Sequence, residues 1–268
     1  MTILVASVAA FVFTTVLTMA GVGAAFVLIP ILVALGVDIH TAMATALLLN
    51  TVAMSVASVS FVRNGLVVWR LVLPMVAAAV ALSPLGVAVS RGLDRTTLLE
   101  LFVAFLLLAA GMMLFYKPRA RAESSSRTVQ TIVGGLVGAL AGFVGGLLGV
   151  GGGNIIVPSL VALGVDPRKA SASASFTVIF ASLSGFLSHM SMANLAPSLL
   201  GSTGVATALG ALLGSWLVGR KLSGAQLKRV IAVVLVAIAL KMAVFDVRGS
   251  ARPQPAHART GDPTVLSR

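Results

Sequence analysis

Long runs without a charged residue are the feature that most restricts the fold. The chain of 268 residues has no Asp, Glu, Lys or Arg in the runs 1–37, 39–62, 71–90, 101–116, 128–165, 170–219 and 230–240. A helix that crosses a bilayer needs about 20 apolar residues, and most of these runs are at least that long. Only 10% of the residues are charged, whereas soluble domains carry roughly 25%. The pattern predicts a polytopic membrane protein and excludes a soluble enzyme.

The net charge of +12 does not indicate a nucleic-acid partner, because of where the basic residues stand. They cluster in short segments between apolar runs, such as the pair Arg63 and Arg70, the segment 117–127 and the segment 220–229. Basic loops of this kind are typical of the cytoplasmic side, beside anionic lipid headgroups. The chain has no cysteine, which excludes disulfides and thiolate metal sites.

The sequence contains two copies of one unit. A shift of 128 residues aligns GVGAAFVLIPILVALGVDIHTAMATA (Gly21–Ala46) with GVGGGNIIVPSLVALGVDPRKASASA (Gly149–Ala174) without a gap, and 14 of the 26 positions are identical. Matches of Leu, Val and Ala arise by chance in membrane sequences. Matched glycine, proline and aspartate residues in one register are much harder to obtain by accident, so we predict an internal repeat.

The repeat divides the chain into four regions. Residues 1–116 form membrane repeat 1, and residues 128–246 form membrane repeat 2. The basic linker 117–127, KPRARAESSSR, is expected on the cytoplasmic side. The tail 247–268 is expected to be disordered. The first 20 residues lack the features of a cleaved signal peptide, and we expect them to form a retained membrane helix.

Each repeat is predicted to be helical throughout, because open sheet edges cannot face lipid. The expected helices span residues 2–20, 25–37, 41–62, 71–90 and 98–116 in the first repeat, and 129–148, 154–165, 169–192, 197–218 and 230–246 in the second. Asp38 and Asp166 stand where a carboxylate would cap the start of the next helix.

The charge-free runs 1–37 and 128–165 are too long for one straight span. A helix of 37 residues would reach about 55 Å, against roughly 30 Å of hydrocarbon. Glycines lie near the middle of each run, Gly21 and Gly23 in the first, and Gly149 and Gly151–Gly153 in the second. Glycine tolerates the positive φ values that a chain reversal requires. We predict that each run enters the membrane, breaks at the glycines and returns as a shorter helix.

The predicted fold class is an all-α polytopic membrane protein with two inverted repeats. Each repeat has a glycine-broken helix pair plus three spanning helices, and an odd number of crossings gives the two repeats opposite orientations. The inverted arrangement places the basic loops on one side, which fits the positive-inside rule. A parallel arrangement is the alternative, because it would place the basic tail inside, although it would place the basic loop 220–229 outside.

The second glycine run is the strongest candidate site. Gly151, Gly152 and Gly153 lead directly into a half-helix that starts near Asn154. Unpaired N–H groups and the positive dipole end of a helix bind anions, and broken helices that face an anionic substrate occur in secondary transporters. We extend the candidate site to Gly21 and Gly23 in the first repeat. The alternative is that these glycines only permit close helix packing.

The quoted residues resemble the TauE/SafE-type sulfite exporter family of duplicated bacterial anion permeases. The resemblance rests on GVGGGNIIVP (Gly149–Pro158), the Ala-x-Ala-Ser pattern at 170–173, SGFLSH (Ser184–His189) and RNGLVVWR (Arg63–Arg70). The first repeat departs from the family pattern, since it has Ala24 and Ala25 where a fuller glycine run is expected. The resemblance implies that the substrate is sulfite or a small organosulfonate, and that the protein lies in a bacterial inner membrane.

Polar side chains near the half-helices are further candidates. Thr45 and Ser173 stand at the same position of the two repeats, and either is a candidate to bind the anion or to bond a backbone carbonyl instead. Asn50 and Asn154 would be costly in lipid without a partner, and Asn154 stands beside the glycines. His189 is a candidate for coupling proton movement to transport, or a histidine of the membrane interface.

The function predicted from the sequence is secondary transport of a small sulfur oxyanion, bound near the membrane midplane and with proton coupling as one option. The alternatives are a passive anion channel and a non-transporting scaffold or accessory subunit. No catalytic residues, no metal site, no cofactor and no nucleic acid are expected. The partners are the anion and the lipid bilayer, and a homodimer is one option for the assembly.

Overall fold

The computed structural model describes residues 2–19, 23–115, 127–191, 197–217, 236 and 240. Within these ranges the regular structure is α-helical and contains no strand, which confirms the all-α class. The helices are α1 (Thr2–Met19), α2 (Ala25–Ala34), α3 (Ile39–Arg63), α4 (Trp69–Arg91), α5 (Arg95–Phe115), α6 (Arg127–Leu148), α7 (Gly153–Ala162), α8 (Pro167–His189) and α9 (Pro197–Leu217). The tail 247–268, residues 117–126 of the linker and most of the expected helix 230–246 lie outside the described residues.

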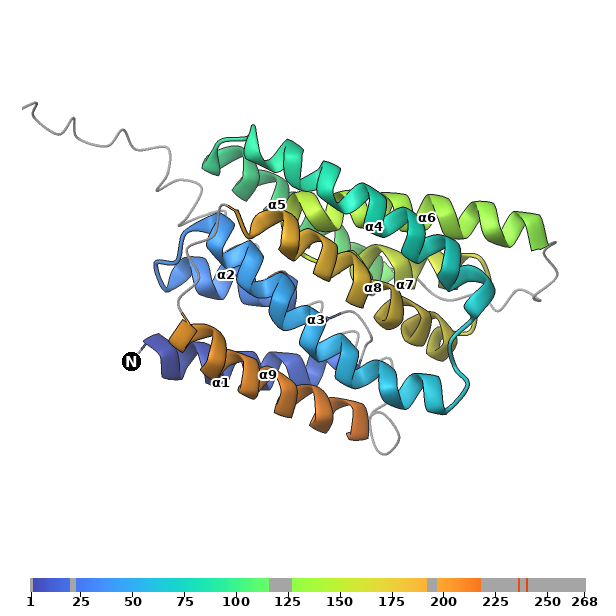
Figure 1. Cartoon of the computed structure of the whole chain (residues 1–268), viewed down its shortest axis with the longest axis horizontal. Helices are drawn as coiled ribbons and strands as arrows, with labels where there is room; N and C mark the ends of the chain where they lie inside the picture. The colour runs from blue at the N-terminus through green and yellow to red at the C-terminus, as the bar shows by residue number, and fades with distance from the viewer. Residues whose placement is uncertain are drawn as a thin grey trace, which may run out of the picture.

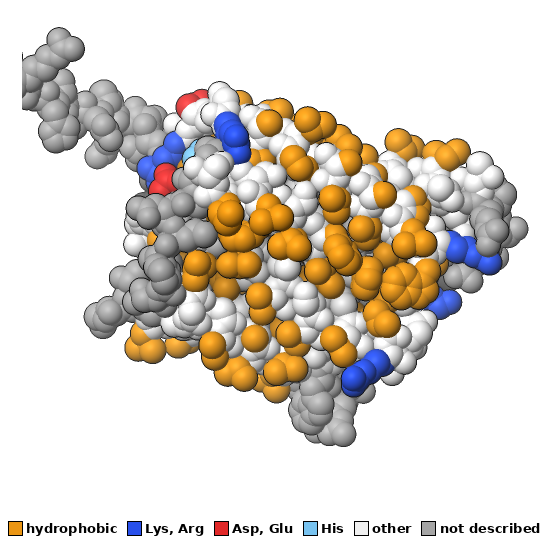
Figure 2. All heavy atoms as spheres, viewed as in Figure 1, with side chains coloured by type: hydrophobic (Ala, Val, Ile, Leu, Met, Phe, Trp, Pro, Cys, Tyr) orange, Lys and Arg blue, Asp and Glu red, His pale blue; other side chains and the backbone are white. Residues whose placement is uncertain are grey.

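Four of the described helices are long and apolar enough to cross a membrane, namely α3, α4, α6 and α8. They run along the long axis of the molecule (Figure 1). Hydrophobic side chains cover the middle of the face in Figure 2, whereas charged side chains gather toward the two ends of the long axis. A band of apolar surface between two charged ends is the arrangement of a multi-pass membrane protein.

Both long charge-free runs are broken at their glycines. The first run consists of α1, which ends at Met19, and α2, which begins at Ala25, and the second consists of α6, which ends at Leu148, and α7. Gly23 has a φ of 84° and its repeat partner Gly151 has a φ of 74°. Only glycine adopts this region of φ without strain, so each returning helix is preceded by a position that requires glycine. The prediction of two helix breaks is confirmed.

The helices that follow the half-helices begin with the predicted caps. The Asp38 carboxylate accepts hydrogen bonds from the backbone N–H groups of His40 and Thr41, and the Asp166 carboxylate accepts from those of Arg168 and Lys169. These bonds satisfy backbone donors that a helix start leaves free. As a result α3 and α8 each begin two residues earlier than the expected 41 and 169.

Glycines hold two helix pairs in close contact, and each pair joins one repeat to the other. On α6, a Cβ placed on Gly138 would lie 2.6 Å from the Cα of Met75, and one on Gly142 would lie 2.5 Å from the Cα of Ala79, both on α4. On α9, Gly210 approaches the backbone of Phe11 on α1 in the same way. Small residues allow such backbone contact between membrane helices. The first helix of each repeat therefore packs on the fourth helix of the other.

Helices α3 and α8, which are repeat partners, lie side by side in opposite directions (Figure 1). Near the start of α3, the His40 ring lies 6.1 Å from the ring of His189 at the end of α8. Beyond the end of α3, the N–H of Val68 donates to the Ser173 hydroxyl near the start of α8 at 3.0 Å. This pair has the antiparallel relation that inverted repeats require. The inverted relation of the two complete repeats stays a prediction.

The two ends of the helix bundle differ in charge. The α3–α4 loop contacts the start of α8, and the start of α4 contacts α6 near Gly134. The same end therefore carries five basic residues and one acidic residue, which are Arg63, Arg70, Arg127, Arg168, Lys169 and Asp166. At the opposite end the described loops and helix ends carry Arg91 and Arg95 together with Asp38 and Asp94.

Candidate anion site between two helix breaks

Asn50 lies between the two glycine breaks. It is fully buried, eleven residues after the first residue of the 25-residue helix α3 and thus close to its middle. A Cβ added to Gly23 would collide with the Asn50 Oδ1 atom, and one added to Gly151 would lie 2.6 Å from Asn50 Nδ2. One asparagine side chain therefore contacts the break of repeat 1 and the break of repeat 2. The site is at half the height of the bundle and at the interface of the two repeats.

At the first break, Asn50 supplies a polar partner for the returning helix. Its Oδ1 atom accepts a hydrogen bond of 3.1 Å from the backbone N–H of Ala24, the residue before α2. Its Nδ2 group donates to the Ser182 hydroxyl on α8 at 3.0 Å. The side chain of Phe26, in the first turn of α2, is fully buried. The N–H of the residue before α2 therefore has a protein oxygen as its acceptor.

At the second break, the start of α7 has no such partner. Gly152, the residue before α7, has a φ of 79°. Its N–H and those of Gly153 and Asn154 donate no hydrogen bond within the described part of the chain. Asn154 is 5% exposed, and neither its Oδ1 nor its Nδ2 atom has a partner among the described residues. Buried polar groups are normally paired, so this cluster of donors is suited to a ligand.

The chemistry of the cluster favours an anion. The freed N–H groups at the start of a helix point along the axis, and the helix dipole adds roughly half a positive charge there. Asn154 Nδ2 adds a further donor. The buried polar side chains in the described residues are threonines, serines, asparagines and a histidine, and no carboxylate is among them to repel an anion. Within the same ranges no three His, Asp or Glu side chains gather as metal ligands would.

The structure brings together most of the glycines predicted for the site. Gly23, Gly151, Gly152, Gly153 and Asn154 are all buried at the two breaks, whereas Gly21 lies outside the described residues. Gly145 of α6 also packs against the break, because a Cβ there would lie 2.9 Å from the Gly152 nitrogen. The glycines thus serve close packing as well as chain reversal. Anion binding by them stays a prediction.

The two predicted hydroxyls lie farther from the breaks. Ser173 is fully buried, and its hydroxyl accepts from the Val68 N–H; it is nine residues from Ser182, which corresponds to about 13 Å along α8. Thr45 is also buried, but five residues of helix place it about 140° around α3 from Asn50. Anion binding by these two side chains stays a prediction. Ser182, which contacts both Asn50 and Gly151, has no counterpart in repeat 1, where Met54 stands.

His189 is fully buried at the last residue of α8, and its role in coupling or as a histidine of the membrane interface stays a prediction. Its Nε2 atom is 3.1 Å from the carbonyl oxygen of Gly146 on α6. A carbonyl only accepts, so Nε2 carries a hydrogen. The Nδ1 atom of His189 and that of the neighbouring His40 have no partner within the described residues. Arg91 lies nearby, since its guanidinium donates to the carbonyl of Ser188 at 2.6 Å.

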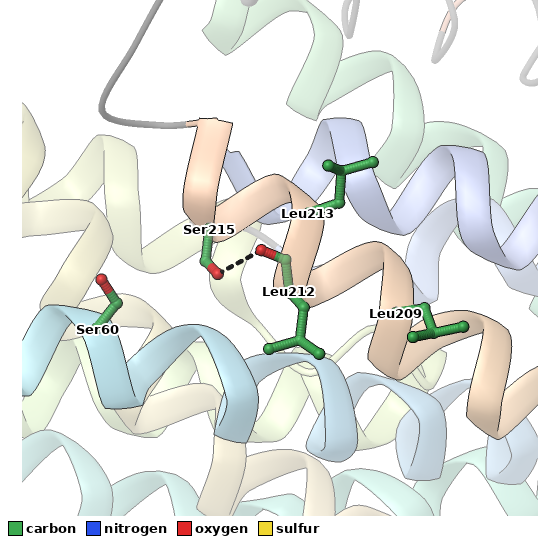
Figure 3. A pocket seen from close by; sticks show the side chains of 5 residues that line it. All are labelled: Ser60, Leu209, Leu212, Leu213 and Ser215. Carbon is green, nitrogen blue, oxygen red and sulfur yellow. Dashed lines mark hydrogen bonds between the residues drawn. The ribbon is translucent and has the colours of Figure 1, made fainter.

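A separate groove of about 580 Å³ lies between α3 and α9 (Figure 3). It is lined by Ser60 of α3 and by Leu209, Leu212, Leu213 and Ser215 of α9. The Ser215 hydroxyl donates to the carbonyl of Leu212 at 3.0 Å. Its leucines are exposed on the apolar outer surface, and Ser60 is ten residues beyond Asn50. The groove has no charged lining group and is not the candidate anion site.

Comparison with known proteins identifies the family of the chain. The chain matches the family described as "Sulfite exporter TauE/SafE" over residues 6–242. This match confirms the resemblance seen in the Gly149–Pro158 motif, and it supports the expectation of a transporter and not an enzyme.

Two curated relatives are also membrane proteins by name. A "Probable membrane transporter protein" of Haemophilus influenzae is 28% identical over 182 residues, which are 63% of this chain and 67% of that protein. The "Probable membrane transporter protein YunE" of Bacillus subtilis is 35% identical over 69 residues, a quarter of either chain. No solved structure matches the chain significantly. Because the family match extends over most of its length, the chain belongs to the TauE/SafE sulfite exporter family of membrane transporters.

Proposed function

We propose that the protein is a secondary transporter that binds a small sulfur oxyanion, such as sulfite or an organosulfonate, at the start of α7. The observation that carries the proposal is the set of buried donors at Gly152, Gly153 and Asn154 that have no partner within the described residues. An oxyanion accepts hydrogen bonds from all of these groups, and a helix start in a water-poor interior is where such an ion binds well.

The position of the cluster supports transport over static binding. It lies at half height, where two broken helices from different repeats meet at Asn50. In secondary transporters with repeats, the substrate lies at this interface, and motion of one part against the other opens the site to each side in turn. The matched packing of the first and fourth helices across the repeats supports the inverted arrangement.

The charge difference between the two ends supports an orientation. Positive residues are enriched on the cytoplasmic side of membrane proteins. The end with five basic residues and one acidic residue, next to the linker 117–127, is therefore the cytoplasmic end in our proposal. The membrane is the inner membrane of a bacterium, in line with the family and with the bacterial relatives.

Anion-dependent stabilisation of the purified protein tests the binding step. A ligand at a hundred times its Kd stabilises the folded state by about 2.7 kcal/mol, so sulfite or methanesulfonate should raise the unfolding temperature. Asn154→Leu should remove most of this response. Thr207→Val is the matched control, because Thr207 is a buried residue of α9 whose hydroxyl also has no partner among the described residues. An unchanged response in Asn154→Leu would refute the site.

Transport measurements in proteoliposomes distinguish a secondary transporter from an anion channel and from a non-transporting scaffold. A secondary transporter should accumulate labelled sulfite against its gradient when a second gradient is imposed. Flux that only dissipates the sulfite gradient would identify an anion channel. A protein that neither binds nor moves any of the tested anions would be a scaffold or accessory subunit.

Proton coupling is the mechanistic part of the proposal, with His189 as its candidate. The His189 ring bridges α8 and α6 and leaves its Nδ1 without a partner in the described residues. The ionisable groups that face it are His40 on α3 and Arg91 on α4. His189→Gln keeps a donor for the Gly146 carbonyl but cannot take up a proton. It should retain sulfite binding and lose the acceleration of flux by a pH gradient; acceleration equal to wild type would exclude this role.

A further inference from the structure

We propose that Asn50 restricts the site to anions with a single negative charge. The inference rests on the proposed function, because it assigns a substrate class to the same site. It follows from a structural difference between the starts of two helices, α2 and α7. Both α2 and α7 begin at the level of Asn50, but only the start of α2 has a side-chain oxygen placed against it.

The charges available to the site are small. The start of a helix contributes roughly half a positive charge, so two helix starts together balance about one negative charge. No buried Lys or Arg side chain adds to them within the described ranges. A dianion at half height would therefore keep an uncompensated charge in a medium of low dielectric constant, which is strongly unfavourable.

Asn50 lowers the available charge further. Its carbonyl oxygen accepts from the Ala24 N–H, which is the place that an oxygen of a bound anion would otherwise take at α2. The side chain is held there because its Nδ2 group donates to Ser182. Gly23 lets the oxygen approach this closely, since a Cβ at that position would collide with it. The equivalent N–H in the second break, that of Gly152, has no partner within the described residues and is left for the ligand.

This arrangement favours a singly charged sulfonate or hydrogensulfite over a doubly charged oxyanion of similar shape. Methanesulfonate and sulfate are suitable probes, because both present a tetrahedral sulfur with oxygens but they carry one and two charges. The full-length protein in detergent is titrated with each anion at constant ionic strength and constant cation, and the half-saturating concentration is measured from the unfolding temperature.

Methanesulfonate should bind the wild-type protein at least about tenfold more tightly than sulfate, which corresponds to the upper range of a single helix-end interaction. Asn50→Ala removes the oxygen from α2 and opens the second helix start, so the preference should fall to about threefold or less. Asn50→Thr, whose side chain is too short to reach the Ala24 N–H, should behave in the same way if Asn50→Ala does not fold. Thr207→Val, the control used above for binding, should keep the wild-type preference.

The outcomes distinguish this inference from the proposed function. If wild type responds to neither anion, nor to sulfite, the proposed site itself fails. If wild type binds methanesulfonate and sulfate equally, the site stands but the restriction by charge is refuted. A wild-type preference that persists unchanged in Asn50→Ala or Asn50→Thr would show that another feature of the site selects the charge.

Discussion

The two helix breaks share one backbone plan but differ in what stands before the returning helix. Gly23 and Gly151 adopt nearly the same φ, yet the next residues are Ala24 with a φ of −100° in the first break and Gly152 with a φ of 79° in the second. At the first break a protein oxygen from Asn50 meets the helix start, and at the second break no side chain does. The largest difference in side-chain chemistry lies two residues farther along the chain, where repeat 1 has Phe26 and repeat 2 has Asn154.

This difference shows how a duplicated unit becomes specialised. The first break is completed by apolar packing and by an internal hydrogen bond, so it is a structural joint. The second break keeps buried donors without partners in the described residues, which costs stability unless a ligand occupies it. A single site can therefore arise from two related breaks when one of them is filled by the protein itself.

The largest effect is expected when the first break is converted toward the second. Phe26→Asn removes a fully buried aromatic ring and leaves an amide in its place. The cavity and the buried polar group together should lower the free energy of unfolding by about 3–5 kcal/mol. Chemical unfolding in detergent measures this change. If the variant is as stable as wild type, or if sulfite rescues it, the first break is not the apolar joint described above.

The second prediction exchanges alanine and glycine at the residue before each half-helix, Gly152 and Ala24. Gly152→Ala places a Cβ on a residue with a φ of 79° and against the Ala141 backbone of α6. The expected loss of stability is about 2–4 kcal/mol. Its matched control, Ala24→Gly, should cost no more than about 1 kcal/mol. Larger residues at 152 would disturb folding, and they are therefore unsuitable for testing binding.

Replacement of Asn50, the side chain between the two breaks, should have the next largest effect on stability. Asn50→Leu leaves the Ala24 N–H and the Ser182 hydroxyl without their partner, which should destabilise the protein by about 2–3 kcal/mol. Ser182→Ala breaks only one of these bonds and should cost about 1 kcal/mol. Equal losses in the two variants would mean that the bond from Ala24 contributes nothing to stability.

The smallest expected change has the opposite sign. Asn154→Leu removes two buried polar atoms that have no partner in the described residues, so the protein without ligand should become more stable by about 1 kcal/mol. Unfolding curves measured without and with sulfite separate this gain from the loss of binding. A clear loss of stability without ligand would show that Asn154 has a structural task like that of Asn50.

The helices and their breaks were predictable because they depend on local patterns. Charge-free runs longer than the hydrocarbon thickness force a break, and only glycine supplies the φ of Gly23 and Gly151. Asp38 and Asp166 were recognisable as caps because a capping carboxylate bonds to residues two and three positions later. The family also followed from a contiguous motif, Gly149–Pro158.

The partners of the polar side chains were not predictable, because they lie far apart in the sequence. Asn50 and Ser182 are 132 residues apart, and the repeat aligns them with Val178 and Met54, so neither has a polar counterpart that would draw attention to it. The position of His189 near a helix end did not reveal that its ring faces α6 instead of lipid. Ser173 was chosen from its alignment with Thr45, but alignment cannot show that its hydroxyl already binds Val68.

The crossed pairing of α4 with α6 and of α1 with α9 means that neither repeat is a self-sufficient folding unit. A half-length chain cut in the linker would expose the glycine-lined surface of its first helix to lipid. The helix of the other repeat that packs closely on this surface would then be missing. The two halves would have to be made together and find each other in the bilayer.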